Sequence, residues 1–453
     1  MLMTPLQDMR PEVSQRTGSV ALLLGIAAAT VAVRLPGSLS QIYPSSVIVV
    51  IALLTVVCTE PRQLFLIRLS SLDVALVVFV AIRILTDVTN SATLDVALPI
   101  PALADWVIIL LAFVSARAVV NLPSELVTFL RYFLAPGYFV AAIGVLQIAG
   151  VGVVTRLVDT FTRSAGLDNR IALGWTELRA TSTIGHWTAL GGYLVVMIAG
   201  SCALIAYTAT CDRKKTWRYV AGLNLLMGGL LSTATFAPII AGFVVILFTI
   251  LLYFRRIESV LLAGGPALAF LYLMYPVLSD RYDKQTYETT AATTQYAWLP
   301  ESMGYRMNIW VTEAIPAGLR REFVGWGSWV YSRIGESATP PELRWPSPES
   351  EWIRTFVTGG WLLLAAEVVL LLILIFKVAR ISRLYGSWIQ PVLWGIVGLI
   401  VISTVHSHFT NRGVPLAIWP IAGAVLSAFI ARYPGRADAE RLAGSDRREE
   451  VCS

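Results

Sequence analysis

The chain has 453 residues, of which 56% are hydrophobic and only 14% are charged, and its mean hydropathy is +0.69. A soluble protein of this size needs more charge to cover its surface, so this composition excludes an ordinary soluble domain. The net charge of +6 does not indicate nucleic-acid binding, because the basic residues stand in short groups at the ends of apolar segments rather than on one soluble face.

Taken in chain order, the apolar segments predict an all-α integral membrane protein with about twelve transmembrane helices. Several of them approach the ~20 residues needed to cross a bilayer core. We expect nine helices within 17–278 and three within 353–431, with an N-terminal tail at 1–16 and a disordered tail at 432–453. The predicted spans are 17–34, 44–59, 72–86, 102–117, 129–150, 184–208, 217–232, 236–254, 259–278, 353–377, 390–408 and 414–431.

The basic residues predict the orientation of these helices. If the N-terminus is cytoplasmic, most Lys and Arg groups fall on the inner side, and the short outer loops 35–43 and 87–101 contain neither residue. This asymmetry is what the positive-inside rule requires, since the rule is scored on short loops and span ends. We therefore expect both termini to be cytoplasmic.

Two longer segments then lie outside, at 151–183 and at 279–352, the second between helices nine and ten. The second contains ten acidic and seven basic residues, and a loop of this length in a compact protein is usually functional or disordered. Its aromatic content argues against disorder. We predict that this large exterior, periplasmic-side loop is catalytic, and that 305–321 forms an amphipathic helix on the membrane surface.

Half of the 14 tryptophans lie in or beside this loop. Tryptophan collects at membrane interfaces, and its flat face also stacks on sugar rings, so the pattern allows either role. The residues are Trp298, Trp310, Trp326, Trp329, Trp345, Trp352 and Trp361.

Arg179, Arg281 and Arg306 stand on the predicted outer side, where the insertion signal disfavours arginine. Guanidinium groups bind phosphate oxygens through paired hydrogen bonds, so the three residues are candidates for a lipid-linked diphosphate. The alternative is ion pairing with the loop acids or with phospholipid headgroups.

Few other residues offer chemistry. His406 and His408 are two apart at the end of a predicted helix and would point in nearly opposite directions, so we expect a polar span end and no metal site. His186 stands where loop meets span and is a candidate ligand contact. Arg83 and Asp87 are one turn apart in a predicted span, and such an ion pair is either functional or structural.

The run GYRMNIWVTEAIPAGLRREFVGWG resembles the O-antigen ligase and O-antigen polymerase family. Members show an arginine followed four residues later by tryptophan and then a G-x-G turn; here these are Arg306, Trp310, Gly325 and Gly327. The run ESEWIRTFVTGGWL is similar to the family's His-Asn element before a glycine-containing span, with Glu349 at the histidine position.

Further elements extend the resemblance to roughly 160–430. The run RATSTIGHWTALGGYL is similar to an arginine-containing segment that enters a middle span, and the twelve-helix topology with its ninth-to-tenth loop matches. Two pairs of residues depart from the pattern: Glu349 and Ser350 stand where the family's ligases have histidine and asparagine, and Thr235 and Phe236 replace a Ser-Arg pair. The glutamate favours polymerase-like members, where this site is more variable.

The resemblance implies a metal-independent, inverting glycosyltransferase of the GT-C type in the bacterial inner membrane, without a cofactor. It would move a glycan from an undecaprenyl-type diphosphate donor to a hydroxyl of a glycan or lipid-glycan acceptor. Arg179, Arg281 and Arg306 would hold the diphosphate, with Arg306 also catalytic.

For the acceptor side, the resemblance implies Glu349 as general base, with Glu351 and Asp283 as rivals. Trp310, Trp326 and Trp352 would stack on the glycan. The alternatives are a twelve-helix transporter or lipid-linked glycan flippase, and a non-catalytic assembly component.

Overall fold

The computed structural model describes residues 11–35, 43–59, 61–162, 179–211, 213–253, 257–287, 296, 299, 301–410 and 413–430. These residues form helices joined by turns, and no strand occurs among them, as the all-α prediction requires. The predicted cytoplasmic tails, apart from residues 11–16 at the start of the first helix, lie outside the described residues.

A helix occupies each of the twelve predicted segments. These helices are α1 (Pro11–Ala29), α2 (Pro44–Thr59), α4 (Ser71–Leu94), α5 (Ile100–Val119), α6 (Pro123–Ile148), α9 (Trp187–Cys211), α10 (Arg213–Ser232), α11 (Phe236–Tyr253), α12 (Ile257–Tyr287), α15 (Glu351–Tyr385), α16 (Gln390–Ile402) and α17 (Gly413–Ile430). Shorter helical elements are α3 (Pro61–Leu66), α7 (Gly152–Thr162), η2 (Ser182–Ile184), α13 (Glu301–Ile309), η4 (Trp310–Ala314), α14 (Ile315–Leu319), η5 (Val330–Ser332) and η6 (Ser387–Ile389).

Five of the described helices are long and apolar enough to cross a membrane. They are Ile100–Val119, Pro123–Ile148, Trp187–Cys211, Phe236–Tyr253 and Glu351–Leu384. Shorter apolar helices accompany them at Pro44–Thr59, Leu268–Asp280, Ser387–Ile402 and Gly413–Phe429. The chain therefore has the helices of a multi-pass membrane protein, while twelve crossings stay a prediction.

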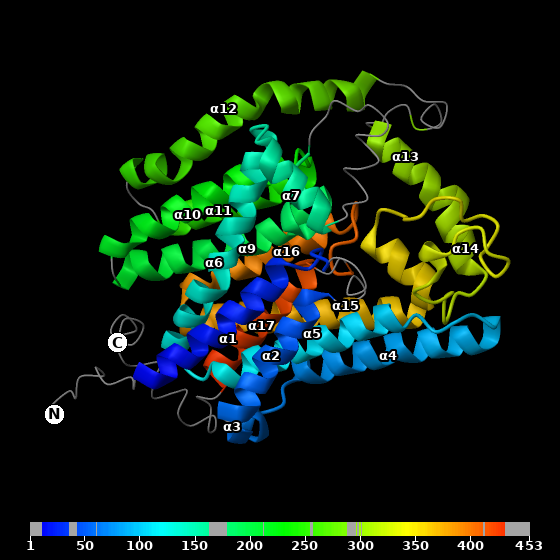
Figure 1. Cartoon of the computed structure of the whole chain (residues 1–453), viewed down its shortest axis with the longest axis horizontal. Helices are drawn as coiled ribbons and strands as arrows, with labels where there is room; N and C mark the ends of the chain where they lie inside the picture. Colours follow the sequence, from blue (N-terminus) through cyan, green and yellow to red (C-terminus); the bar gives the residue numbers. More distant parts are fainter. Residues whose placement is uncertain are drawn as a thin grey trace.

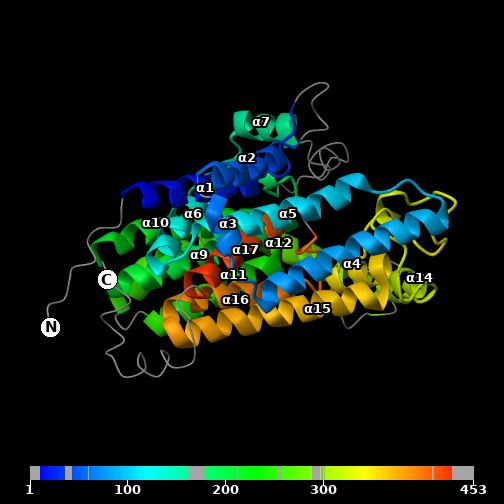
Figure 2. The same ribbon diagram turned by 90° about the horizontal axis from the view of Figure 1, so that it is seen from below.

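The helices lie roughly parallel in one bundle (Figure 1). Helix α9 is its centre: the apolar window of this helix is 100% buried, with α6, α10, α11, α16 and α17 packed around it. Helices α4 and α15 run side by side along one face of the bundle (Figure 2). Because α9 is covered by protein on all sides, its apolar residues form a core rather than a lipid-facing surface.

One end of the bundle is tied together by buried polar contacts. Arg117 at the end of α5 pairs with Asp73 at 3.0 Å, and Asp73 also accepts the Ser70 backbone N–H in the capping box that starts α4. Ser427 of α17 donates to the Arg117 carbonyl. Helix α1 begins and α17 ends at this end (Figure 1). The start of α1 and the end of α17 therefore lie at the same end of the bundle.

The opposite end carries α13, η4 and α14, together with the outer ends of α4 and α15 (Figure 1). The helical run 301–319 coincides with the amphipathic helix expected at 305–321. Helix α12 continues to Tyr287, beyond the predicted span end at 278, and α16 ends at Ile402 rather than 408. The polar side chains predicted to carry chemistry gather at this end.

Candidate active site

An ion pair between Arg306 and Glu349 is the centre of the candidate site. The Arg306 Nη2 atom lies 2.6 Å from Glu349 Oε2, and the two side chains are 13% and 29% exposed. Arg306 also donates from Nη1 to the Ser302 carbonyl at 2.8 Å. The two residues singled out as catalytic are therefore in contact, across 43 residues of sequence, at a place that solvent reaches.

Hydrogen bonds fasten the segment before α15 to the helical run 301–319. Trp310 donates from its indole to the Pro348 carbonyl at 2.6 Å, four residues after Arg306. Glu313, three residues further, accepts the backbone N–H groups of Arg344 and Trp345 at 3.0 and 3.1 Å. Trp310 and Glu313 both lie in η4, a single π-helical turn, so this turn and Arg306 before it together hold the segment 344–349, called the strap below.

Glu349 itself has a left-handed backbone, with φ of 49°. A residue with a Cβ rarely adopts this conformation and does so at some cost in energy. The Glu349 N–H donates to Ser347 Oγ at 3.2 Å, which helps to hold the turn. Strained residues of this kind concentrate at functional sites, and here the strain aims the carboxylate at Arg306.

Aromatic rings border the pair. Tyr305 packs edge-on against Trp345 at 5.3 Å between ring centroids. Burial, then the charges of Glu349 and Glu313, raise the pKa of the Tyr305 phenol, so it stays protonated beside the carboxylates. Trp345 is 40% exposed. Tyr305 was not selected from the sequence, and Trp345 was named only as one of the seven loop tryptophans, because nothing in their spacing distinguishes them from other loop aromatics.

The G-x-G turn docks the loop onto a kink in α15. Gly325 has φ of 60°, and a Cβ there would lie 2.4 Å from the backbone of Thr358 and Gly359. The kink is at Gly360, whose φ of 66° is not helical. Backbone hydrogen bonds run from Trp326 to Val357 and from Gly327 to Thr358. Glycine is needed at Gly325 because both its conformation and its close approach exclude a side chain.

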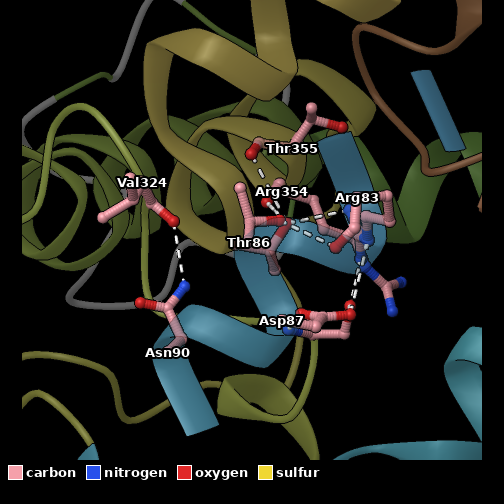
Figure 3. A network of polar contacts seen from close by, with 9 residues as sticks. Arg83, Thr86, Asp87, Asn90, Val324, Arg354 and Thr355 are labelled. Carbon is pink, nitrogen blue, oxygen red and sulfur yellow. Dashed lines mark hydrogen bonds and ion pairs between the residues drawn. The ribbon is translucent and has the colours of Figure 1, made fainter. Parts of the chain in front are cut away.

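Arg83 and Asp87 anchor the same loop to α4 (Figure 3). Both are buried, and Arg83 donates to Ser328 Oγ at 2.7 Å and to Thr358 Oγ1 at 3.2 Å. Asp87 accepts both the N–H and the hydroxyl of Ser328 at 2.6 Å. One turn later Asn90 donates to the Val324 carbonyl at 2.9 Å. The pair therefore joins helix, loop and α15.

We expect Asp87→Ala to lower the free energy of unfolding by about 3–5 kcal/mol, since it leaves Arg83 buried without its carboxylate. Thermal unfolding of the purified protein measures this loss. Asp95→Asn is the matched control: Asp95 is exposed at the end of the same helix, and asparagine tolerates its left-handed backbone. Equal unfolding temperatures for the two variants would contradict the anchoring role.

The rival bases have different surroundings. Glu351 is fully buried and accepts the backbone N–H groups of Phe409 and Thr410, at 2.9 and 3.3 Å. Its own N–H donates to the Ser403 carbonyl at 2.9 Å. Asp283, near the end of α12, is exposed. Glu351 is therefore occupied in holding the turn between α16 and α17, two residues from the exposed Glu349.

Of the other predicted arginines, Arg179 is 7% exposed. It donates to the Ala234 carbonyl at 3.2 Å, and its guanidinium lies 5.3 Å from the Trp187 ring centroid. The side chain of Arg281 lies outside the described residues, although its backbone is part of α12. Arg179 precedes η2 and Arg306 lies in α13, so the two arginines stand on separate elements.

Contacts within the protein hold the three tryptophans that were predicted to stack on the glycan. The Trp326 indole donates to the Ala317 carbonyl at 2.7 Å, and Arg321 lies 5.4 Å from its ring. Trp310 is the strap contact described above, and Trp352 packs against the main core. Each is partly buried, so only part of each ring is open to a ligand.

The positions of His406 and His408 differ from those that the sequence predicted. Because α16 ends at Ile402, His406 and His408 lie in a turn, and their ring centroids are 6.0 Å apart rather than on opposite helix faces. His408 is 0% exposed, and neither of its ring nitrogens has a hydrogen-bond partner among the described residues. His186 stacks on Trp187 at 4.1 Å.

Burial lowers the pKa of His408 to about 3. In the unfolded chain the pKa is about 6.5, so between these values the unfolded state binds a proton that the folded state does not. Stability is then lost as pH falls below about 6.5, by about 2 kcal/mol at pH 5 for this residue. We expect thermal unfolding to show this loss between pH 7 and 5, and His408→Gln to reduce it; an unchanged pH slope in the variant would contradict the assignment.

Comparison with known proteins gives one family. Residues 221–368 match the family described as O-antigen ligase, a segment that runs from α10 through α13, η4 and α14 into α15. It includes Arg306 and Glu349 but not Arg179 or His406. No curated protein matches the chain. The resemblance stated from the sequence is confirmed over this segment, and together with the apolar helices the match indicates a membrane enzyme of glycan transfer.

Proposed function

We propose that the protein is a glycosyltransferase of the O-antigen polymerase and ligase type, working at the outer face of the bacterial inner membrane. It moves a glycan from an undecaprenyl-type diphosphate donor to an acceptor hydroxyl, with inversion at the anomeric carbon. The observation that carries this proposal is the Arg306–Glu349 pair, placed in the matched segment at the exposed end of an apolar bundle.

In the reaction, the acceptor oxygen attacks the anomeric carbon while the bond from that carbon to the diphosphate oxygen breaks. The electron pair leaves with the diphosphate, and the acceptor proton goes to the Glu349 carboxylate. Arg306 stabilises the charge that develops on the departing oxygen, and a donor fixed in advance at such a place lowers the barrier. Glu349 is the general base.

The ion pair implies an exchange of partners. A carboxylate bound to Arg306 at 2.6 Å occupies the position that a phosphate oxygen needs. A diphosphate offers more charge and more oxygens to the guanidinium than one carboxylate does. Donor binding therefore displaces Glu349, and the freed carboxylate becomes available to the acceptor.

Arg179 and Arg281 extend the diphosphate site in this proposal, and Trp310, Trp326 and Trp352 border the acceptor path. Exposed Trp345 adds a ring next to Arg306 and Glu349. Membrane lipids surround the bundle, with both termini on the cytoplasmic side.

The direct test is glycan transfer by the purified full-length chain in lipid nanodiscs, with an undecaprenyl-diphosphate oligosaccharide and no added divalent metal. We expect lengthened or transferred glycan and released undecaprenyl diphosphate, also in the presence of EDTA. A requirement for magnesium or manganese contradicts the metal-independent mechanism. Movement of the donor across the bilayer without transfer would indicate a flippase instead.

A further inference from the structure

Helix α7 (Gly152–Thr162) closely follows the spanning helix α6 and lies at the margin of the bundle (Figure 2). Between the two helices the chain turns in a Schellman motif: Gly150, with φ of 75°, donates to the Gln147 carbonyl, and Val151 donates to the Leu146 carbonyl. The four peptide steps from the last residue of α6 to the first residue of α7 reach at most about 14 Å. Helix α7 therefore starts close to the level at which α6 ends.

The other end of α7 is held at the same end of the bundle. The Phe161 carbonyl accepts the backbone N–H of Arg34 at 2.7 Å. Arg34 follows the end of α1, and α1 packs along α6. A helix of 11 residues is about 16 Å long. Because its two ends are tied to the ends of two neighbouring helices, α7 lies across these helix ends instead of continuing along the bundle.

Two faces of α7 match the protein and the water beside it. Residues four positions apart share a face of a helix, so each face is a stripe along α7. Val158 and Thr162 are buried and form the stripe that packs on the protein. A second stripe is exposed and consists of small or polar residues: Gly152, Arg156 and Thr160.

A third stripe, between the other two, is apolar and also exposed. It consists of Val153, Leu157 and Phe161, whose side chains are 59%, 53% and 42% exposed. Three large apolar side chains on one face of a short helix indicate an interaction surface.

The exposed apolar surface of α6 continues into this stripe. Tyr132, Phe139 and Leu146 are exposed at intervals of seven residues and so line one face of α6, which in a spanning helix is the face that meets lipid. Exposed Val151 and Val153 follow directly after the turn that ends α6. The surface that meets lipid on α6 therefore extends onto α7, at the level where the spanning helix leaves the bilayer.

We propose that α7 is a membrane-interface helix that binds the phospholipid surface through Val153, Leu157 and Phe161. The apolar stripe enters the boundary between headgroups and acyl chains, and the Gly152–Arg156–Thr160 stripe faces water. Arg156, at the border of the two stripes, lays its apolar stem along the lipid and keeps its guanidinium among the headgroups. With both termini cytoplasmic, as proposed above, this is the outer leaflet. Lipid binding by α7 does not depend on glycan transfer.

Fluorescence quenching on the full-length protein tests the proposal. The fluorescent amino acid Anap replaces one residue at a time in the two exposed stripes, and the protein is placed in nanodiscs of phosphatidylethanolamine and phosphatidylglycerol. Added lipids carry a nitroxide on the headgroup or on the acyl chain, and the two quenching efficiencies give the depth of the label. We expect labels at the apolar stripe to lie about 5–10 Å deep. Labels at the polar stripe are expected to be quenched by iodide from water instead.

The adjacent residues Arg156 and Leu157 are the matched pair, because both side chains are exposed and only their faces differ. Equal quenching by iodide at both positions, without quenching by lipid, overturns the proposal. Equal depth at both positions also overturns it, since α7 would then lie inside the bilayer. A label at Leu157 that neither lipid nor iodide quenches would be covered by protein, which likewise contradicts lipid binding. Each outcome leaves the glycan-transfer assay unaffected, so the proposed function is tested separately.

Discussion

Replacing Arg306 by glutamine is expected to lower kcat for glycan transfer by about 10²–10³-fold, because the variant loses the charge positioned for the departing diphosphate. Radiolabelled or fluorescent glycan transfer in nanodiscs measures the rate. Arg306 is a contact between loop segments rather than part of the bundle core, so the variant is expected to remain inserted and folded.

The chain offers a matched control for this variant. Arg320 pairs with Glu342 in the same exterior region, and its side chain is 54% exposed. Arg320→Gln removes one loop arginine and one ion pair without touching the Arg306 site, so its kcat is expected to stay close to the wild-type value. An equal loss of rate in both variants would show that loop ion pairing, rather than diphosphate stabilisation, explains the effect.

Glu349→Gln is expected to change binding and turnover in opposite directions. It removes the general base, a contribution of about 10²–10⁴-fold to the rate. It also removes the internal anion that competes for Arg306, so farnesyl diphosphate should bind more tightly than it does to the wild type. Transfer assays and calorimetric titration of the same preparation measure the two effects.

Glu342→Gln is the corresponding control, with wild-type values expected for both measurements. Near-normal turnover of Glu349→Gln would move the base elsewhere, to Asp283 or Glu351. Weaker binding of farnesyl diphosphate would contradict the partner exchange, because it would mean that the Glu349 charge supports the anion site instead of competing for it.

Sequence patterns predicted the helices well because each is encoded locally. Apolar runs of bilayer length, such as Trp187–Cys211, need only their own composition to be recognised. The end of α16 was placed incorrectly at residue 408. The segment after Ile402 is polar, and Glu351, from another part of the chain, binds the backbone of Ser403 and Phe409 and so fixes a turn there. These tertiary contacts have no local signal.

In the candidate site too, the residues were easier to predict than the long-range contacts between them. Arg306 was selected as an arginine on the predicted outer side and Glu349 from a resemblance. Their contact depends on hydrogen bonds that Trp310 and Glu313 make to residues 31–38 positions away. The roles of Ser328 and Asn90 were not predictable, because their partners are 234–241 residues distant. The approach of the His406 and His408 rings to 6.0 Å likewise comes only from the folded turn.

The Arg83–Asp87 pair has a consequence for how the protein is made. Ser328, which Asp87 binds in the folded protein, is synthesised 241 residues later, a delay of about 10–50 s at common translation rates. During that time α4 is already at or in the bilayer with two ionisable side chains. The two groups are one turn apart and lie 4.0 Å from each other, so each neutralises the other while α4 waits. In the nascent helix, Arg83 and Asp87 are therefore each other's counter-ion. Their contacts with the loop form only after α15 has been synthesised.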